Sequence, residues 1–569
     1  MNKHTPFFTV AIGLTLTFAA SADVYHFRTV AKTGDPVPQV GGTFLEFGWP
    51  RINSSGQVAF AASRTADVGQ TGIWLAPLDQ PDAMQAIMLA GTQVPDSAPG
   101  TVFDHYTFAD DGPEINDAGH IAFVASLLGL PGESPNGAFR FVNGTLTKVA
   151  ATGDPAPGIG GATLARISRW CGFNESDLMA FGVELGGQGV TEDDDVAIYM
   201  HWFGGLNLVK REGNPSPPNG FGWTWGTNAT GSVQNFLPLV QIADNGRIGF
   251  DSEVFTNSGS TVSRWTGWPG ALSHGMLAGN LSPEFHPFVN QLGNFGVYSM
   301  HLTEDGFAFY HAVDVNGEEA TGIWRYDGNS LETVAQEGAA GPLGEYKSIW
   351  PYSIVTAFDG TVAFSATFTP FDPTTDGALL IRRPNQQAVA LVREGDAAPG
   401  YWPNVVFSST MSMLAIDDSS RIYSHMHVSG PGIDATNNSG IWRMRPDGQV
   451  QLVVRKGQTI TLDDGIERQV ANMQVHRGSG LHTGARPGIN NAGDVALWLA
   501  FTDDTSAVVV AEPTCLGDLN IDNTVDVSDL LLLLAAWGPC DACDADLDES
   551  GSVDVSDLLI LLGAWGGCP

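Results

Sequence analysis

Short runs of alternating apolar and polar residues, separated by glycine-rich turns, fill the chain from residue 23 to residue 512. Alternation with a period of two predicts β-strands that bury one face. Helical periodicity is nearly absent from this region. It appears near the C-terminus, where two apolar runs of helical character follow acidic segments. The pattern predicts a mainly-β body over 23–512 and a small α-helical module over 513–569.

One repeated motif is an apolar strand that ends in glycine and is often followed by Asp-Pro or Asp-x-x-Pro-Gly. Clear copies occupy 30–36, 149–158 and 392–400, and weaker copies bring the total to eight, 57 to 66 residues apart. The eight glycines are Gly34, Gly91, Gly153, Gly213, Gly279, Gly338, Gly395 and Gly457. A fixed period of this length indicates a repeat architecture.

A second motif, Ile-Asn-x-x-Gly followed by an alternating strand, falls between successive copies of the first. Its clear forms lie at 52–60, 115–123 and 489–497. Asn or Asp opens a tight turn, and glycine takes the position with positive φ, so each copy predicts a hairpin. The five degenerate copies centre on Asp177, Gly246, Gly306, Gly360 and Ser420.

A third motif, Gly-Ile-Trp, marks another strand at 72–74, 322–324 and 440–442. Each unit therefore holds about four short strands in roughly 60 residues, and eight such units predict an eight-bladed β-propeller. The chain begins with a lone copy of the fourth strand, Val24–Ala31, and the last unit stops at its third strand, Ala507–Ala511. We expect the N-terminal strand to complete the last blade, which removes free sheet edges. An open array and two smaller propellers are the alternatives.

The tandem Asn-x-x-Gly-x-x-Ala-Phe units resemble the secreted bacterial "choice-of-anchor" proteins named for this repeat. The resemblance covers about 23–512 and is clearest in the first two copies. It implies export and a C-terminal anchor, and it implies no established activity.

Residues 515–569 contain two copies of one unit at an offset of 28. Each copy opens with an acidic loop whose positions 1, 3, 5, 7, 9 and 12 supply oxygen atoms, the ligands that Ca²⁺ prefers. In the first copy these positions are Asp518, Asn520, Asp522, Thr524, Asp526 and Asp529. In the second copy they are Asp546, Asp548, Ser550, Ser552, Asp554 and Asp557.

Two features distinguish these loops from helix–loop–helix calcium hands. Position 12 is Asp rather than Glu, and one helix follows each loop, predicted over 528–537 and 556–565. With Val525 and Val553 at position 8, the module resembles a dockerin of the cysteine-bearing "GC-type". The resemblance implies two bound Ca²⁺ ions and a cohesin-like partner. The implied partner contacts are Val527, Ser528, Val555 and Ser556.

The charge balance restricts the classes of partner. The chain has 26 Lys and Arg against 62 Asp and Glu, a net charge of −36, which excludes electrostatic capture of nucleic acid or an anionic membrane surface. The same acidity favours a soluble monomer. The last 55 residues hold 11 acidic residues and no Lys or Arg, so we expect folding of the module to be coupled to its metal.

Export is predicted by the first 22 residues. Lys3 precedes an apolar run of about 14 residues, and Ala20-Ser21-Ala22 forms a signal-peptidase site, so we expect the mature chain to begin at Asp23. An uncleaved membrane anchor is the alternative, but the run is shorter than the roughly 20 residues needed to span a bilayer.

Export also favours disulfides among the four module cysteines. Cys515–Cys568 with Cys540–Cys543 is the preferred pairing, because the two ends of a dockerin lie together. Cys515–Cys540 with Cys543–Cys568 and a zinc site remain alternatives. Cys171 stands alone, beside Trp170, and is expected to be a buried strand residue.

The propeller carries no recognisable catalytic motif. A metal held by His425 and His427 with His476 or His482, and a cation at Glu192–Asp195, are weaker hypotheses than ordinary surface or core side chains. Trp223 and Trp225 are candidates for stacking on sugar rings. The sequence favours a non-catalytic binding or display module. The alternatives are a polysaccharide hydrolase or lyase of an extracellular catabolic system, and a structural surface or adhesion protein.

Overall fold

The computed structural model describes residues 25–513 and 517–567, with gaps. The gaps are 66–70, 79, 81–82, 105–111, 133, 214–223, 227–239, 257–258, 278–299, 316–317, 329, 351–352, 370–371, 373–374, 410–413, 479–485, 521–523, 540–544, 548–549 and 551. Two compact units divide the chain, Tyr25–Pro513 and the residues from Thr514 onward. Each is described here by itself. No helix among the described residues is long and apolar enough to cross a membrane.

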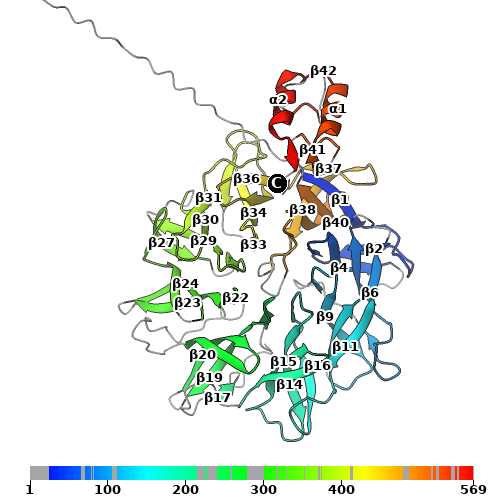
Figure 1. Ribbon diagram of the computed structural model, residues 1–569, viewed down its shortest axis with the longest axis vertical. Helices are drawn as coiled ribbons and strands as arrows, with labels where there is room; N and C mark the ends of the chain where they lie inside the picture. The colour runs from blue at the N-terminus through cyan, green and yellow to red at the C-terminus, as the bar shows by residue number, and fades with distance from the viewer. Residues whose placement is uncertain are drawn as a thin grey trace, which may run out of the picture. The chain divides into compact units, whose positions relative to one another are not determined.

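The first unit is an eight-bladed β-propeller, as the repeats predict: eight antiparallel sheets follow one another around a ring (Figure 1). Blade 1 comprises β2 (Phe44–Phe47), β3 (Arg51–Ile52), β4 (Gln57–Arg64), β5 (Thr71–Pro77) and β6 (Gln85–Leu89), and blade 2 comprises β7 (Val102–Phe103), β8 (Glu114–Ile115), β9 (Ile121–Leu128), β10 (Asn136–Val142) and β11 (Thr145–Ala151). Blade 3 comprises β12 (Ala162–Ile167), β13 (Gly172–Phe173), β14 (Met179–Gly187), β15 (Val196–Trp202) and β16 (Gly205–Arg211). Blade 4 comprises β17 (Thr224–Gly226), β18 (Gln241–Ile242), β19 (Ile248–Thr256), β20 (Gly259–Trp268) and β21 (Ala271–Leu277).

Blades 5 to 8 continue the ring. Blade 5 comprises β22 (Met300–Leu302), β23 (Phe307–Val315), β24 (Glu318–Tyr326) and β25 (Leu331–Gln336), and blade 6 comprises β26 (Ala340–Gly341), β27 (Gly344–Ile349), β28 (Val355–Thr356), β29 (Val362–Thr369), β30 (Gly377–Arg382) and β31 (Val389–Arg393). Blade 7 comprises β32 (Val406–Ser409), β33 (Leu414–Ile416), β34 (Ile422–Ser429), β35 (Ser439–Met444) and β36 (Val450–Arg455). Blade 8 comprises β37 (Thr459–Thr461), β38 (Glu467–Val475), β39 (Val495–Phe501), β40 (Ser506–Pro513) and β1 (Tyr25–Lys32).

The first strand of a blade is typically broken into two short pieces. In blade 1, β2 pairs with the end of β4 and β3 with its beginning. Gly48-Trp49-Pro50 separates the two pieces, and Pro50 has no N–H to donate to a ladder. The inner pieces β3, β8, β13, β18, β22, β28 and β33 contact one another in turn, so they line the centre of the ring.

The N-terminal strand closes the ring, as the sequence predicts. β1 pairs antiparallel with β40, from Tyr25 opposite Pro513 to Lys32 opposite Ala507, with an irregularity between Thr29 and Ala31. The last blade is thus assembled from both ends of the propeller unit.

The hydrophobic core lies between neighbouring blades. Trp74 and Trp442 from the Gly-Ile-Trp strands are fully buried. The Trp74 cluster contains Val508 and Val510 from blade 8, so this tryptophan fills the interface between the last blade and the first. Burial of the repeated tryptophans accounts for their recurrence without a ligand-binding role.

The second unit consists of two loop–helix copies. Its helices are α1 (Val527–Ala535) and α2 (Val555–Gly563), and its two small ladders join β41 (Thr524–Val525) to β44 (Gly566–Gly567) and β42 (Gly538–Pro539) to β43 (Ser552–Val553). Its core contains Val525, Leu533, Ala545, Val553 and Leu561. The helices end two residues earlier than predicted, because the chain turns into a ladder at glycines with positive φ, Gly538 and Gly566.

Candidate functional site

The Asn-x-x-Gly turns lie at the centre of the ring, and their first residue has two tasks. The Asn53 side-chain oxygen accepts hydrogen bonds from the backbone N–H groups of Ser55 and Gln57, at 3.1 and 2.8 Å, and so holds its own turn. Its Nδ2 donates to the carbonyl of Asn116 in the next blade, at 2.9 Å. The motif therefore joins neighbouring blades as well as forming a hairpin.

The same bond between blades recurs where the motif keeps its asparagine. Asn116 donates to the carbonyl of Asn174 at 3.2 Å, and Asn174 donates to that of Ala243 at 2.9 Å. Asn490 donates to the carbonyl of Asn53 at 3.2 Å and so joins the last blade to the first. All four asparagines are buried, where an amide needs such partners. The alanine in the fourth turn, Ala243, has no side-chain amide for this link.

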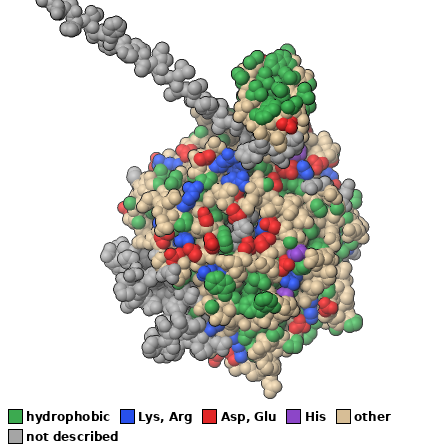
Figure 2. All heavy atoms as spheres, in the orientation of Figure 1, with side chains coloured by type: hydrophobic (Ala, Val, Ile, Leu, Met, Phe, Trp, Pro, Cys, Tyr) green, Lys and Arg blue, Asp and Glu red, His purple; other side chains and the backbone are tan. Residues whose placement is uncertain are grey.

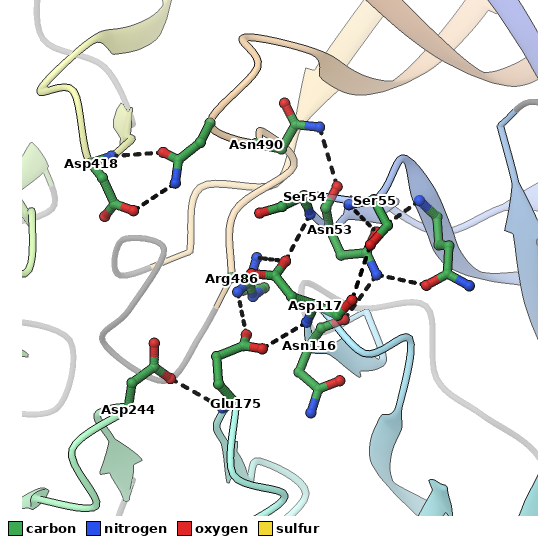
Figure 3. A network of polar contacts seen from close by, with 12 residues as sticks. Asn53, Ser54, Ser55, Asn116, Asp117, Glu175, Asp244, Asp418, Arg486 and Asn490 are labelled. Carbon is green, nitrogen blue, oxygen red and sulfur yellow. Dashed lines mark hydrogen bonds and ion pairs between the residues drawn. The ribbon is translucent and has the colours of Figure 1, made fainter. Parts of the chain in front are cut away.

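The second turn residue carries a carboxylate in five of the eight turns: Asp117, Glu175, Asp244, Glu304 and Asp418. Three of these acids accept hydrogen bonds from the equivalent backbone N–H of the preceding blade (Figure 3). The bonds are Ser54 N–H to Asp117 at 2.8 Å, Asp117 N–H to Glu175 at 2.8 Å and Glu175 N–H to Asp244 at 3.1 Å. Asp and Glu side chains gather around the centre of the ring face drawn in Figure 2.

Arg486 provides the positive charge that meets two of these acids. It comes from the segment between β38 and Ile489, it is 5% exposed, and it forms ion pairs with Asp117, at 2.9 Å, and with Glu175 (Figure 3). The Arg486 carbonyl accepts a hydrogen bond from Arg51 at 2.7 Å. No periodic pattern marks this residue, so sequence reasoning missed it. The sequence feature that could have pointed to Arg486 is the long segment between the strand that ends at Val475 and the Ile-Asn motif of blade 8.

The pKa values around Arg486 follow from burial and charge. Burial acts to raise the pKa of Asp117, but Arg486 and the hydrogen bonds from Ser54 outweigh it, and the pKa lies below its ordinary value. Burial raises the pKa of Glu175 despite the nearby Arg486. Both carboxylates are thus held by Arg486 and by a backbone N–H of the preceding blade or turn.

Arg51, Glu114 and His476 form a second set of buried polar contacts next to Arg486. Arg51 donates to Glu114 at 2.7 Å, and its Nη2 lies 3.2 Å from Nε2 of His476. The structure thus gives His476 an arginine neighbour in blade 1. His425 and His427 lie together in β34, with ring centroids 5.7 Å apart, and His482 lies outside the described residues. Burial, with His427 and Lys456 nearby, lowers the pKa of His425 to about 4.

Within the described part of the chain, no group of three or more His, Cys, Asp or Glu residues is placed to hold a metal ion. The acidic loop at 192–195 forms a turn: Asp194 accepts hydrogen bonds from Thr191 N–H, at 2.7 Å, and pairs with Arg211 at 2.7 Å. Trp223 lies outside the described residues, as does the side chain of Trp225, so their stacking role stays a prediction. Cys171 is half-buried in the loop before β13.

In the helical unit, positions 9 and 12 of each predicted calcium loop together cap the helix that follows. Asp526 and Asp554 are the N-cap residues, and Asp529 and Asp557 complete reciprocal capping boxes. Asp529 also accepts the backbone N–H of Leu519, at 2.7 Å, so its carboxylate turns back toward the start of its own loop.

Asp529 and Asp557 are fully buried, and Asp518 is nearly so. The segment from 515 onward contains no Lys or Arg that could neutralise them. Backbone N–H groups of Leu519, Asn520 and Asp526 satisfy part of the Asp529 carboxylate, and an oxygen-rich loop of this kind fits a hard cation such as Ca²⁺. Asp546 accepts Ser550 N–H at 3.0 Å, which closes the second loop. Asp522, Asp548 and the cysteines 515, 540, 543 and 568 lie outside the described residues.

The helices of this unit expose large apolar side chains, and Figure 2 shows much of its surface as hydrophobic. Val527 is 58% exposed and its counterpart Val555 59%, and Ser528 and Ser556 are exposed beside them. The remaining exposed apolar residues of the unit are Leu531, Leu532, Leu534, Trp537, Leu559, Leu562 and Trp565. An exposed apolar surface of this extent marks an interaction site.

Comparison with known proteins identifies the family. A family of unknown function, DUF7453, matches residues 18–77, 65–267 and 287–515. The chain belongs to this family. The DUF7453 match therefore covers the propeller and stops at the start of the helical unit. No curated protein matches the chain.

Solved structures similar to this DUF7453 protein include a protease β-propeller domain and two polysaccharide lyases. The β-propeller domain of the Trilobed protease from Pyrococcus furiosus is 11% identical, with a TM-score of 0.36, over 75% of this chain and 98% of that one. An ulvan lyase is 11% identical, with a TM-score of 0.33, over 87% and 96%. The polysaccharide lyase Uly1 is 10% identical, with a TM-score of 0.32, over 75% and 98%. Likenesses at this level carry no information about activity.

Proposed function

We propose that this protein is an exported attachment protein. Its C-terminal unit binds two Ca²⁺ ions, docks as a dockerin to a cohesin-like partner outside the cell, and carries the propeller as a binding or display module. The observation that carries the proposal is the burial of Asp529 and Asp557 in a unit without Lys or Arg.

The candidate calcium ligands divide into two equivalent sets. Asp518, Asn520, Thr524, Asp526 and Asp529 are the described members of the first, and Asp546, Ser550, Ser552, Asp554 and Asp557 those of the second. Ca²⁺ supplies the positive charge that these loops lack. When the carboxylates are neutralised, each loop and its helix form one rigid unit.

The exposed apolar helix faces support docking through this unit. Val527 and Val555 occupy position 10 of the two loops and begin the two helices, so any calcium-dependent ordering of the loops fixes the geometry of the surface beside them. Removal of such side chains from water on binding contributes about 25 cal/mol per Å² of apolar area.

A catalytic role for the propeller is not part of the proposal. Asp117 and Glu175, two carboxylates at the centre of the ring, are paired with a buried arginine, an arrangement that stabilises the ring. The propeller therefore enters the proposal as a rigid platform.

The docking proposal is tested by surface plasmon resonance of the full chain over immobilised type I and type II cohesin domains, in calcium and in EGTA. We expect calcium-dependent binding that is lost in the double variant Val527→Asp/Val555→Asp. The matched control is Val389→Asp in β31, which is 54% exposed on the propeller and should leave binding unchanged. Absence of binding to every cohesin, or binding that persists in EGTA, would contradict the proposal.

A further inference from the structure

The propeller carries an exposed aromatic surface that neither the ring closure nor the attachment function uses. It lies where blades 3 and 4 meet, on the edge of the ring that bears the Asn-x-x-Gly turns. We call it the aromatic sector and define it by Leu178, Trp202, Phe203, Arg247 and Trp268.

Strand pairing brings these residues to one edge. In blade 3, Met179 at the start of β14 lies opposite His201 near the end of β15, so Leu178 and Trp202 are neighbours. In blade 4, Ile248 at the start of β19 lies opposite Gly267 near the end of β20, which places Arg247 beside Trp268.

Gly246 connects the two halves of the sector. A Cβ atom at this glycine would lie 3.6 Å from Leu178 and 4.0 Å from Trp268, so the two side chains border the same backbone position. Leu178 and Trp202 pack against one shared core cluster, and the rings of Trp202 and Phe203 lie 6.3 Å apart. The Trp202–Phe203 pair of blade 3 and Trp268 of blade 4 therefore flank the junction of two blades, with Leu178 between them and Gly246.

The rings are fixed in place and still meet solvent. Trp268 donates its indole N–H to the Asn245 carbonyl at 3.2 Å, and the Arg247 guanidinium lies 4.7 Å from the ring centre, yet the residue is 47% exposed. Phe203, at the tip of the hairpin between β15 and β16, is fully exposed. A fully exposed phenylalanine loses hydrophobic stabilisation that burial would provide, so its position favours contact with a ligand.

Polar groups suited to hydroxyl recognition surround the rings. Ser176, Asn245 and Glu304, from the turns of blades 3, 4 and 5, are exposed. Pyranose rings present C–H faces that stack on aromatic rings, and hydroxyl groups that bond amides, hydroxyls and carboxylates. The exposed apolar groups of the sector are few and are interrupted by these polar turns. A stable protein interface buries at least about 1,200 Å² of surface, so the sector suits a sugar ligand better than a protein partner.

The charged groups around the aromatic sector determine which class of glycan it can bind. The turn residues Glu175, Asp244 and Glu304 place carboxylates beside the sector. Of the two cations here, Arg486 is paired with Asp117 and Glu175, and Arg247 stacks on the Trp268 ring. A polyanionic glycan would be repelled by these groups and by the net charge of −36.

We propose that the aromatic sector binds an uncharged polysaccharide, with Trp268 and the Trp202–Phe203 hairpin stacking on its sugar rings. The proposal rests on the proposed function only in treating the propeller as the binding part of the chain. The two claims fail separately: EGTA abolishes docking to a cohesin and leaves glycan retention intact, whereas Trp268→Ala has the opposite effect.

The test is affinity gel electrophoresis of the full chain in mixed-linkage β-glucan, xylan, galactomannan and laminarin, with alginate and polygalacturonate as anionic comparators. We expect retardation by at least one uncharged polysaccharide. Affinity should fall by about tenfold or more in Trp268→Ala and in Phe203→Ala, because each substitution removes a stacking surface. Trp268→Phe keeps an aromatic face and should retain most of the affinity, which separates stacking from folding.

Trp402 provides the matched control. It is 38% exposed, donates its indole N–H to the Pro431 carbonyl at 2.6 Å, has Arg455 nearby at 5.9 Å, and lies in blade 7. Trp402→Ala should bind like the unaltered protein. The proposal is overturned if no uncharged polysaccharide retards the protein, if only the anionic ones do, if Trp268→Ala and Phe203→Ala bind normally, or if Trp402→Ala loses as much affinity as they do. A protein ligand for this surface would appear as the first of these outcomes.

Discussion

The propeller and the C-terminal unit solve the same electrostatic problem in different ways. Both place carboxylates in tight turns, but the propeller supplies its own positive charges: Arg486 meets Asp117 and Glu175, and Arg421 meets the buried Asp417 at 2.5 Å. The C-terminal unit buries Asp529 and Asp557 without any Lys or Arg in its sequence. The comparison shows that a cluster of acidic residues can be interpreted only when the positive charges around it are known. Under the proposed function, the helical unit obtains its positive charge from Ca²⁺, whereas the propeller carries its own.

The largest effect should come from calcium removal. In differential scanning calorimetry of the full chain, we expect EGTA to abolish or strongly lower the transition of the helical unit and to leave that of the propeller in place. At calcium concentrations about a thousandfold above the dissociation constant, each site contributes about 4 kcal/mol. If EGTA lowers both transitions equally, or neither, the contrast between the two regions is wrong.

The next effect is on the propeller itself. Arg486→Ala leaves Asp117 and Glu175 without their counter-charge, and we expect the free energy of unfolding of the propeller to fall by about 3 kcal/mol. Urea unfolding followed by tryptophan fluorescence measures it. The control is Arg393→Ala, an exposed arginine that donates to the Thr375 carbonyl, which should change stability by less than about 1 kcal/mol. Equal effects of the two substitutions would show that Arg486 has no special role.

A smaller effect should follow from loss of one link between blades. Asn174→Ala removes the hydrogen bond to the Ala243 carbonyl and takes away the side-chain oxygen that accepts the N–H groups of Ser176 and Leu178, at a cost of about 1–3 kcal/mol. Ser176→Ala, at an exposed position in the same turn, should stay within about 0.5 kcal/mol of the unaltered protein. The same urea experiment compares the two variants. An unchanged unfolding midpoint in Asn174→Ala would show that this hydrogen bond between blades does not stabilise the propeller.

These turns show what the sequence could and could not predict. The hairpin at 52–60 follows from local chemistry, because Asn, Gly and the alternating strand act within a few residues. The bond from Asn53 to the next blade depends on the ring, so it became visible only in three dimensions. The same holds for Arg486, whose partners lie more than 300 residues away. Repeats and alternation predicted the eight blades and the closure by β1, whereas the charges that meet across the centre carry no local pattern.

The smallest effect concerns pH and the closing strand. The hairpin between β37 and β38 holds β1: Asp463 accepts Thr29 N–H at 2.9 Å, and Asp464 pairs with Arg468 at 2.8 Å. The hydrogen bonds from Arg468 lower the pKa of Asp464 to about 2. Because this pKa lies below the unfolded value of about 4, the stabilisation is present above that pH and is lost as the pH falls toward 2.

Asp464→Asn should therefore weaken the propeller slightly near neutral pH and reduce the loss of stability between about pH 4 and pH 2. Urea midpoints across this range measure the slope. Asp447→Asn, at another turn aspartate, is the control for the substitution itself. A slope that is identical in Asp464→Asn and the unaltered protein would show that this pair does not contribute to closure.

The central claim is that the C-terminal unit is completed by two calcium ions, and isothermal titration calorimetry tests it most directly. Calcium would be titrated into the full, chelator-treated chain and into Asp529→Asn, Asp557→Asn and the double variant. The account predicts two ions for the unaltered chain, one for each single variant and none for the double variant. Absence of calcium binding by the unaltered chain, or two ions still bound by the double variant, would contradict it.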